Sequence, residues 1–535
     1  MTQSRTHYIP VSGITIDTIK DAIGDILPGL IDDAVGDILN PPPATYCPAN
    51  GYFPTDFPTY EPPIDTVPEP AEGEVILLCS NEGQAAVSVY AMPAFTVTVY
   101  NDLNEEVFSI NQGSGATYTY SFPKDGGLKY YIVKIKGQSS GLTRFRRGSV
   151  SGNANNWSII EAIINAPLLQ HLSGGFMNVA MLKKCTMMGS YNSLITMDSM
   201  FQLSGIETFT FPSSLPSLAT VFSMFLQSEV ISIVCNTHAP QLTTMASFAS
   251  KCMRLNAMAL TITGVPPITT FQDFISYCPS LKTLDASGIV TYNTSTTNKN
   301  ISYFAKFCPN IENIKTPAIN HDLKYPYIVT EAFDGCFKLR SITFCGSWSI
   351  SRNDSALRDC FSLEELIYGT TEFGDAALFT YPPTISYAKN FKKIRLPDTW
   401  TAGNTSDITP AISQNIEEVT GCTVGFSAVL GVGHLRVNSA KLHTVNLPLF
   451  APTAVSLGAP GAPITEVIID WANKTQTVGH NIYVAGSLPA SEINRIYGLL
   501  PTTAVLITID FRSNPGFAAA DHSIAQAKGY TVTGA

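Results

Sequence analysis

The feature that most restricts the fold of this chain is a hydrophobic pair that recurs between residues 182 and 467, one apolar residue followed three positions later by another. Successive pairs lie about 22 to 30 residues apart, a period typical of solenoid repeats. A unit of this size cannot cover its own apolar side, so each turn must stack on its neighbours. The pairs are Leu182/Cys185, Ile206/Phe209, Val230/Ile233, Leu255/Met258, Leu281/Leu284, Ile311/Ile314, Leu339/Ile342, Leu363/Leu366, Phe391/Ile394, Ile416/Val419, Leu442/Val445 and Ile464/Val467.

The composition agrees with a stack of short strands and turns. Only 14% of the 535 residues are charged, and the 38 Gly and 35 Pro are about as numerous as the 32 basic and 42 acidic residues. Long surface helices need charged outer faces, which are scarce in this sequence. We therefore expect a mainly β protein, too long for one compact domain.

A second mark precedes five of the pairs, where a cysteine stands three residues before the first hydrophobic position. Because these thiols recur once per turn, they are predicted to form a buried stack with a structural role. Disulfides or zinc ligation are the alternatives. The cysteines and the apolar residues before them are Phe248/Cys252, Phe274/Cys278, Phe304/Cys308, Phe333/Cys336 and Leu357/Cys360.

The fullest copy of the repeat is Ala332-Phe333-x-x-Cys336-x-x-Leu339-x-x-Ile342, which resembles the BspA-type leucine-rich repeat in the order and spacing of its residues. The resemblance implies a leucine-rich-repeat solenoid over residues 148–499. The segment with Leu500-Pro-Thr-Thr and Ser513-Asn-Pro-Gly516 resembles the terminal cap of such arrays, which implies a C-terminal cap over 500–535. Repeats of this type occur in surface adhesins of Bacteroides-like bacteria and in virion appendages of their phages, including crAss-like phages.

The first 74 residues read as an anchor followed by a spacer. Apolar residues recur at helical spacing, and Asp21-Ala-Ile-Gly-Asp-Ile-Leu27 is nearly repeated at Asp33-Ala-Val-Gly-Asp-Ile-Leu39. Two short helices cannot bury such a stripe alone, so residues 1–40 are predicted to dock on another protein or on copies of themselves. Folding back onto the β domain of the same chain is the alternative. Prolines make residues 41–74 an extended spacer. The stripe comprises Ile16, Ile19, Ile23, Ile26, Leu30, Val35 and Ile38.

Residues 75–147 contain short runs of β-branched and aromatic residues separated by turn formers, which predicts a small Ig-like β-sandwich. The stretch Phe95-Thr-Val-Thr-Val-Tyr-Asn101 resembles the polycystic-kidney-disease-like module, although Val99 to Asp102 replace its Trp-Gly-Asp-Gly signature. The basic run Arg144 to Arg147 is interpreted as a solvated junction to the repeats.

Charges alternate in sign at the position after the first hydrophobic residue of six successive repeats. Equivalent positions on neighbouring parallel strands lie about 5 Å apart. We expect a structural charge ladder that fixes the register of the repeats and is not a ligand site. The residues are Lys282, Glu312, Arg340, Glu364, Lys392 and Glu417.

Several function classes are not expected. A net charge of −10 argues against nucleic-acid binding, and no apolar run approaches the ~20 residues of a membrane-spanning helix. The histidines and cysteines show no metal-ligand spacing, and no cofactor motif is present. The string Gly137-Gln-Ser139-Ser-Gly141 is not followed by the helix that a nucleophile elbow requires, so no catalytic residues and no enzyme activity are predicted.

The sequence therefore predicts a mainly β protein, in which N-terminal helices and a small Ig-like sandwich precede a BspA-type leucine-rich-repeat solenoid. The first ten residues show no Sec-type export signal, which favours assembly in the host cytoplasm and release in a virion. The expected function is a phage tail or head fibre that is homo-oligomeric and docks to other virion proteins through its N-terminus. Its expected ligand is a host-surface glycan or protein receptor. A bacterial surface adhesin is the alternative.

Overall fold

The computed structural model describes residues 67–534 with internal gaps. The predicted N-terminal helices and most of the spacer therefore lie outside the described residues. The gaps are 82–85, 125–126, 139–140, 148–157, 294–299, 322–329, 346–355, 369–390, 396–398, 403–406, 409–414, 422–424, 429–433, 438, 450, 452–453 and 474–480.

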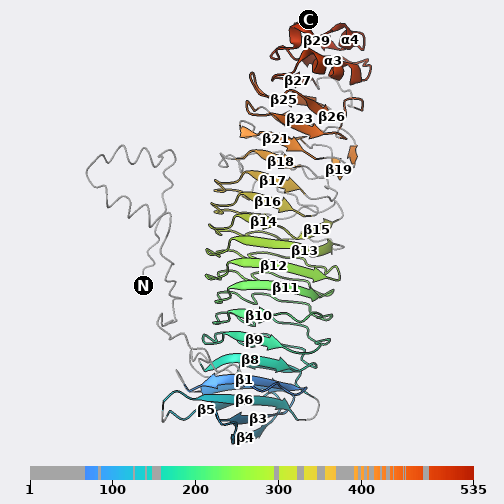
Figure 1. The fold of residues 1–535 in the computed structure, drawn as a ribbon. Coiled ribbons are helices and arrows are strands. Elements are labelled where there is room, and N and C mark those ends of the chain that lie inside the picture. Colours follow the sequence, from blue (N-terminus) through green and yellow to red (C-terminus); the bar gives the residue numbers. More distant parts are fainter. Residues whose placement is uncertain are drawn as a thin grey trace, which may run out of the picture. The chain divides into compact units, whose positions relative to one another are not determined.

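The predicted repeat register is confirmed by an 11-stranded parallel sheet (Figure 1). The second residue of each predicted pair lies in a strand, and from Ile233 onward it faces its counterpart in the next turn, as in Ile314, Ile342 and Leu366. The chain is therefore a β-solenoid. The strands, in spatial order, are β11 (Ser232–His238), β12 (Ala257–Thr263), β13 (Thr283–Asn293), β14 (Asn313–Lys315), β16 (Ser341–Phe344), β17 (Glu365–Tyr368), β18 (Lys393–Arg395), β21 (Glu418–Thr420), β24 (Thr444–Leu447) and β26 (Val467–Ile469), with β15 (Ala318–His321) beside β13.

The first turns of the solenoid share a seven-stranded sheet with the preceding antiparallel β module. Strand β1 (Glu74–Ser80) pairs antiparallel with β6 (Tyr130–Gly137) on one side and with β8 (Ile159–Asn165) on the other. Parallel pairing then begins with β9 (Lys184–Met187) and β10 (Thr208–Thr210). The module thus covers the open end of the repeat stack by continuous hydrogen bonding.

The remaining strands of this module are also paired antiparallel, in two sheets. Strand β3 (Phe95–Tyr100) lies between β6 and β4 (Glu106–Gln112) in the shared sheet. A three-stranded sheet has the order β5 (Thr117–Ser121), β2 (Ala86–Met92) and β7 (Arg144–Arg147). The predicted strands are present, whereas the membership of an Ig-like family stays a prediction.

The basic run Arg144–Arg147 is a strand and not the solvated junction that the sequence predicts. It pairs with β2, and Arg144 forms a parallel bridge with His171 in the first solenoid turn. Phe145 is buried, and its ring centroid lies 5.7 Å from that of Phe176. The alternation of arginine with an inward Phe145 is too short to be recognised as a strand from the sequence.

The C-terminal part of the solenoid adds a second parallel stack and the helices found in the described residues. The six-stranded sheet has the order β20 (Asp407–Ile408), β23 (His434–Val437), β25 (Ala454–Leu457), β27 (Ile482–Val484), β28 (Thr508–Asp510) and β29 (Thr531–Val532). Strands β19 (Thr399–Ala402) and β22 (Gly425–Ala428) form a separate pair. Helices α3 (Ala490–Leu499) and α4 (Ser523–Gln526) and the 3-10 helix η4 (Phe517–Ala519) lie in the last turns.

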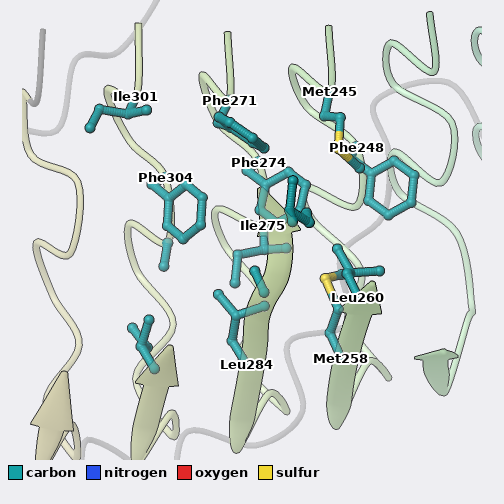
Figure 2. Close-up of a cluster of buried hydrophobic side chains, with 14 of the residues drawn as sticks. Met245, Phe248, Met258, Leu260, Phe271, Phe274, Ile275, Leu284, Ile301 and Phe304 are labelled. Atoms are coloured by element: carbon teal, nitrogen blue, oxygen red, sulfur yellow. The ribbon is translucent and has the colours of Figure 1, made fainter. Parts of the chain in front are cut away.

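A stack of phenylalanine rings fills the interior opposite the sheet. Figure 2 shows Phe248, Phe274 and Phe304 on successive turns, with Leu260 and Leu284 projecting toward them from the strands. The place of the ring within the repeat shifts by one residue along the stack. The ring is the second residue of the pair Met224-Phe225 but the first residue of the pair Phe248-Ala249. Each turn therefore pairs one ring with a smaller side chain. Centroid distances along the stack are 5.9 Å for Phe176–Phe201, 5.4 Å for Phe201–Phe225, 5.4 Å for Phe225–Phe248, 5.6 Å for Phe248–Phe274, 5.1 Å for Phe274–Phe304 and 6.1 Å for Phe304–Phe333.

The five regular cysteines form the predicted buried stack, and each thiol also donates a hydrogen bond to the preceding turn. In one example, the Sγ atom of Cys308 lies 3.0 Å from the carbonyl oxygen of Ile275. Ser228 occupies the same position one turn before Cys252. Burial raises the pKa above that of an ordinary thiol for Cys252, Cys278, Cys336 and Cys360, which keeps these groups protonated as donors. The other bonds are Cys252–Phe225 (2.9 Å), Cys278–Ala249 (3.1 Å), Cys336–Ala305 (3.1 Å) and Cys360–Phe333 (3.2 Å).

Left-handed backbone recurs in the turns that precede the strands. Two columns of residues, four positions apart, have φ between 51° and 60° although they are not glycine. This conformation directs the backbone N–H along the stack, and Gln227 N donates to the carbonyl oxygen of Ser250 at 2.9 Å. The strain is tolerated because every such bond fixes one turn against the next. The columns include Ser199, Ser223, Ser247, Asp273 and Tyr303, and Asn178, Leu203, Gln227, Lys251, Tyr277 and Phe307.

Substitution of Cys308 tests the thiol ladder. Cys308→Ser and Cys308→Ala remove similar volumes, but only serine keeps a donor for the carbonyl oxygen of Ile275. We expect Cys308→Ser to have a free energy of unfolding about 0.5 to 1.5 kcal/mol higher than that of Cys308→Ala. Denaturant titration of both variants measures the difference. Equal or reversed stability would show that packing alone retains the cysteine.

Glycine substitution tests the backbone strain. Gln227 has a φ of 58°, whereas the half-buried Gln202 on the preceding turn is not among the residues of positive φ. Gln227→Gly should raise the free energy of unfolding by about 0.5 to 1 kcal/mol, because glycine adopts this conformation without steric cost. Gln202→Gly should lower it by about 0.5 to 1 kcal/mol, because glycine loses more backbone entropy on folding than glutamine does. A destabilising effect of similar size at both positions, measured by thermal unfolding, would contradict the interpretation.

Candidate binding surface

The candidate binding surface is the solvent-facing side of the 11-stranded sheet. Along β11 the side chains alternate strictly, so that Ile233 and Cys235 are buried whereas Ser232, Val234 and Asn236 are exposed. The inward residues pack against the phenylalanine stack, whereas the outward residues are not part of the core. Because the parallel strands are in register, the outward residues form rows that cross the sheet.

The first row changes in character along the sheet. Small and polar side chains occupy it from β11 to β16, and charged side chains follow from β17 to β21. Within the polar half, the hydroxyl of Ser341 donates to Oδ1 of Asn313 at 2.8 Å. This row therefore offers hydrogen-bonding groups with little apolar bulk. The row comprises Ser232, Ala257, Thr283, Asn313, Ser341, Glu365, Lys393, Glu418 and Thr444.

The next outward row contains an ion pair between neighbouring strands. Nζ of Lys315 lies 2.8 Å from Oδ2 of Asp285, and both side chains are exposed by about half. Partial burial acts to raise the pKa of Asp285, but hydrogen bonds from Lys315 and Ser287 outweigh it and hold the pKa below its ordinary value. The pair is therefore charged at neutral pH.

The six residues of the predicted charge ladder lie at one margin of this sheet, just before the strands. From Glu312 onward, the backbone N–H of each donates to the carbonyl oxygen of the ladder residue before it, with N···O distances of 2.7 to 2.9 Å. Among the six, a side-chain ion pair within 4.0 Å forms between Lys392 and Glu417, at 3.5 Å. The positions are thus in register, and the energetic role of the ladder stays a prediction.

A second charged column escaped the sequence analysis. Glu365, Lys393 and Glu418 follow the ladder residues directly and occupy register positions on β17, β18 and β21. Lys393 and Glu418 form an ion pair at 2.9 Å. This column could have been found in the sequence. Adjacent residues of like charge, such as Glu364/Glu365, show that the alternation of sign in the ladder recurs one residue later in the same repeats.

The structure shows no site for a metal ion within its described ranges, since no three His, Cys, Asp or Glu side chains gather there. None of the helices in those ranges is long and apolar enough to cross a membrane. The predicted anchor residues Ile16, Ile19, Ile23, Ile26, Leu30, Val35 and Ile38 lie outside the described residues.

A comparison with solved structures finds similarity to a crystal structure of a leucine-rich repeat protein from Bacteroides ovatus, at 14% sequence identity and a TM-score of 0.19. The match covers 51% of this chain and 84% of that protein. No family model matches the chain, and no curated protein matches it. The description of this chain as a β-solenoid rests on its own strand pairing and repeat register.

Charge reversal at Glu364 tests the ladder. Glu364→Lys places a third cation between Arg340 and Lys392 on neighbouring turns, so the free energy of unfolding should fall by about 0.5 to 1 kcal/mol. Glu364→Gln should produce a smaller loss. Thermal unfolding at low and high salt measures both changes, and the difference should shrink in high salt. An unchanged melting temperature for Glu364→Lys would exclude a role in register.

Proposed function

We propose that this chain is a binding protein of a phage virion, a tail or head fibre that docks through its N-terminus and presents the solenoid to a host surface. The observation that carries the binding role is the outward face of the 11-stranded sheet. Its side chains are mostly small, polar or charged, and the core does not need them. A long array of this kind is suited to recognition by shape and hydrogen bonding.

The virion role rests on the order of segments in the sequence. An amphipathic stripe in residues 14–39 precedes a proline-rich spacer, and the repeats follow. Such an order suits a protein that is held at one end and displays its body at a distance. The resemblance to BspA-type repeats implies a phage appendage or a bacterial adhesin. The docking stripe favours the first, and an adhesin of the bacterial surface is the second candidate.

The proposal predicts that purified phage particles contain this chain. Ile19→Asp combined with Ile23→Asp should remove the protein from particles and lower its subunit count in light scattering, because charges interrupt the apolar stripe. The melting temperature of the solenoid should not change. Asp21→Asn, within the same segment, serves as the matched control and should be retained in particles.

Two results would contradict the virion role. One is a chain that mass spectrometry finds on intact bacterial cells lacking a prophage and not in particles, which would establish the adhesin instead. The other is an unchanged subunit count together with normal incorporation of the doubly substituted protein, which would exclude docking through the stripe.

A further inference from the structure

Four aromatic rings are exposed on consecutive turns at the margin of the solenoid that precedes the strands. Tyr277, Phe307, Phe337 and Phe361 are 41%, 38%, 43% and 47% exposed. The rings of Tyr277 and Phe307 lie 5.3 Å apart, and those of Phe337 and Phe361 stack at 5.9 Å with an interplanar angle of 13°. We call these four residues the aromatic strip.

The strip is not required by the core, because the same turns already contribute the buried rings of Phe274, Phe304 and Phe333. Its geometry is nevertheless fixed by the fold. Gly335 has a φ of +75°, and a Cβ at this position would lie 2.4 Å from Cδ1 of Phe307. The ring of Phe307 thus lies against a turn that only glycine leaves open. Exposed apolar rings held in place mark a surface for contact.

A polar groove with a volume of about 470 Å³ is lined by residues from the turns that carry Tyr277, Phe307 and Phe337. The groove and the strip are continuous in the chain, since Lys338 directly follows Phe337 and Asn310 directly follows Pro309. The backbone N–H of Lys338 donates to the carbonyl oxygen of Pro309 at 3.1 Å, which holds adjacent turns together at the groove. The groove is lined by Arg254, Ser280, Lys282, Asn310, Glu312 and Lys338, among others.

The groove is locally positive on a chain whose net charge is −10. Lys282 and Lys338 are exposed, and neither forms an ion pair with any residue in the described ranges. Arg254 is already engaged by Glu207, at 2.9 Å. Glu312 is half-buried and lies on the turn between the two lysines. A ligand that follows the groove therefore meets a cation, an acid and a cation on three successive turns.

This order matches the repeat of a particular class of polymer. Successive turns are about 4.8 Å apart, a rise comparable with the length of one sugar unit in an extended polysaccharide. A polysaccharide with one acidic sugar in each disaccharide has an anion at every second unit. Its anions would face Lys282 and Lys338, and its uncharged sugar would place hydroxyl donors beside Glu312.

We propose that the aromatic strip and the adjoining groove bind an extended polysaccharide that carries one anionic sugar in each disaccharide. Sugar rings pack against the exposed parts of the aromatic rings, the lysines bind the anions, and Glu312 accepts hydrogen bonds from the neutral sugar. The inference rests on the proposed role in surface recognition and specifies its ligand. It departs from the sequence prediction that the charge ladder is not a ligand site, because the ladder residues Lys282 and Glu312 line the groove.

The backbone at this margin disfavours an extended acidic peptide. A peptide that adds to a β-edge needs free backbone N–H and C=O groups. The N–H groups of Lys282, Glu312 and Arg340 already donate to the preceding turn at 2.9, 2.8 and 2.8 Å. A ligand at this margin can therefore contact only side chains. These are aromatic rings and charged groups, spaced like the units of a sugar chain.

The test uses calorimetry on the full chain with three probes. They are hyaluronan oligosaccharides with one carboxylate per disaccharide, oligogalacturonate with one per sugar, and neutral cello-oligosaccharides. Hyaluronan should bind most tightly, because every carboxylate of oligogalacturonate that faces Glu312 is repelled. Lys282→Gln and Lys338→Gln should each weaken hyaluronan binding about tenfold. Glu312→Gln should reduce the difference in affinity between hyaluronan and oligogalacturonate.

Matched variants separate the site from general charge and hydrophobicity. Phe337→Ser with Phe361→Ser should weaken hyaluronan binding about tenfold. Phe222→Ser should leave binding unchanged, because Phe222 is 46% exposed but lies outside the strip. Lys124→Gln, in the β module, should also have no effect. Equal affinity for the neutral probe, or competition by polyglutamate at the same site, would overturn the inference.

Binding to intact host cells distinguishes this inference from the proposed function. If the full chain binds cells and the Lys282→Gln/Lys338→Gln double variant binds them equally well, the polysaccharide site is wrong and the recognition role stands. If the unchanged chain binds neither cells nor any probe, both proposals fail.

Discussion

The burial of each turn against the next is the interaction on which the rest of the structure depends. A single turn has one apolar side and no second layer of its own to cover it. The phenylalanine stack, the thiol-to-carbonyl bonds and the left-handed turn residues all lie between turns and connect them. Stability is therefore shared along the stack, and both ends require closure. The antiparallel module closes one end through the pairing of β1 with β8.

The repeat register was predictable because an inward residue at a fixed spacing leaves a periodic signal, and Ile314, Ile342 and Leu366 are in line as expected. Strand β4 was not predicted, since Glu106–Gln112 is an edge strand with mostly exposed or half-buried side chains. The sequence also gives no sign of the positive φ of residues such as Lys251 and Tyr277. There, bonds between turns override the local preference for glycine, and a single sequence does not report such bonds. For the candidate surface, the sequence located the charge ladder but not its single close ion pair.

The two external surfaces differ in how they are built. On the sheet face, rows of outward side chains cross regular strands, so their positions are set by strand register. At the strip and groove, the side chains come from turns, and the contact of Phe307 with Gly335 fixes a ring where no strand holds it. Both surfaces repeat once per turn. A linear ligand that lies along the stack can therefore gain one contact for each turn that it spans.

Strand β1 also has a mechanical consequence. Its seven residues, Glu74–Ser80, are hydrogen-bonded to β6 on one side and to β8 on the other, both antiparallel. A tensile force applied at Glu74 along the strand would load both ladders in shear, so many bonds would have to rupture together. An edge strand pulled sideways would instead open one bond at a time. A load applied at the N-terminal end of β1 thus acts at a point that resists rupture.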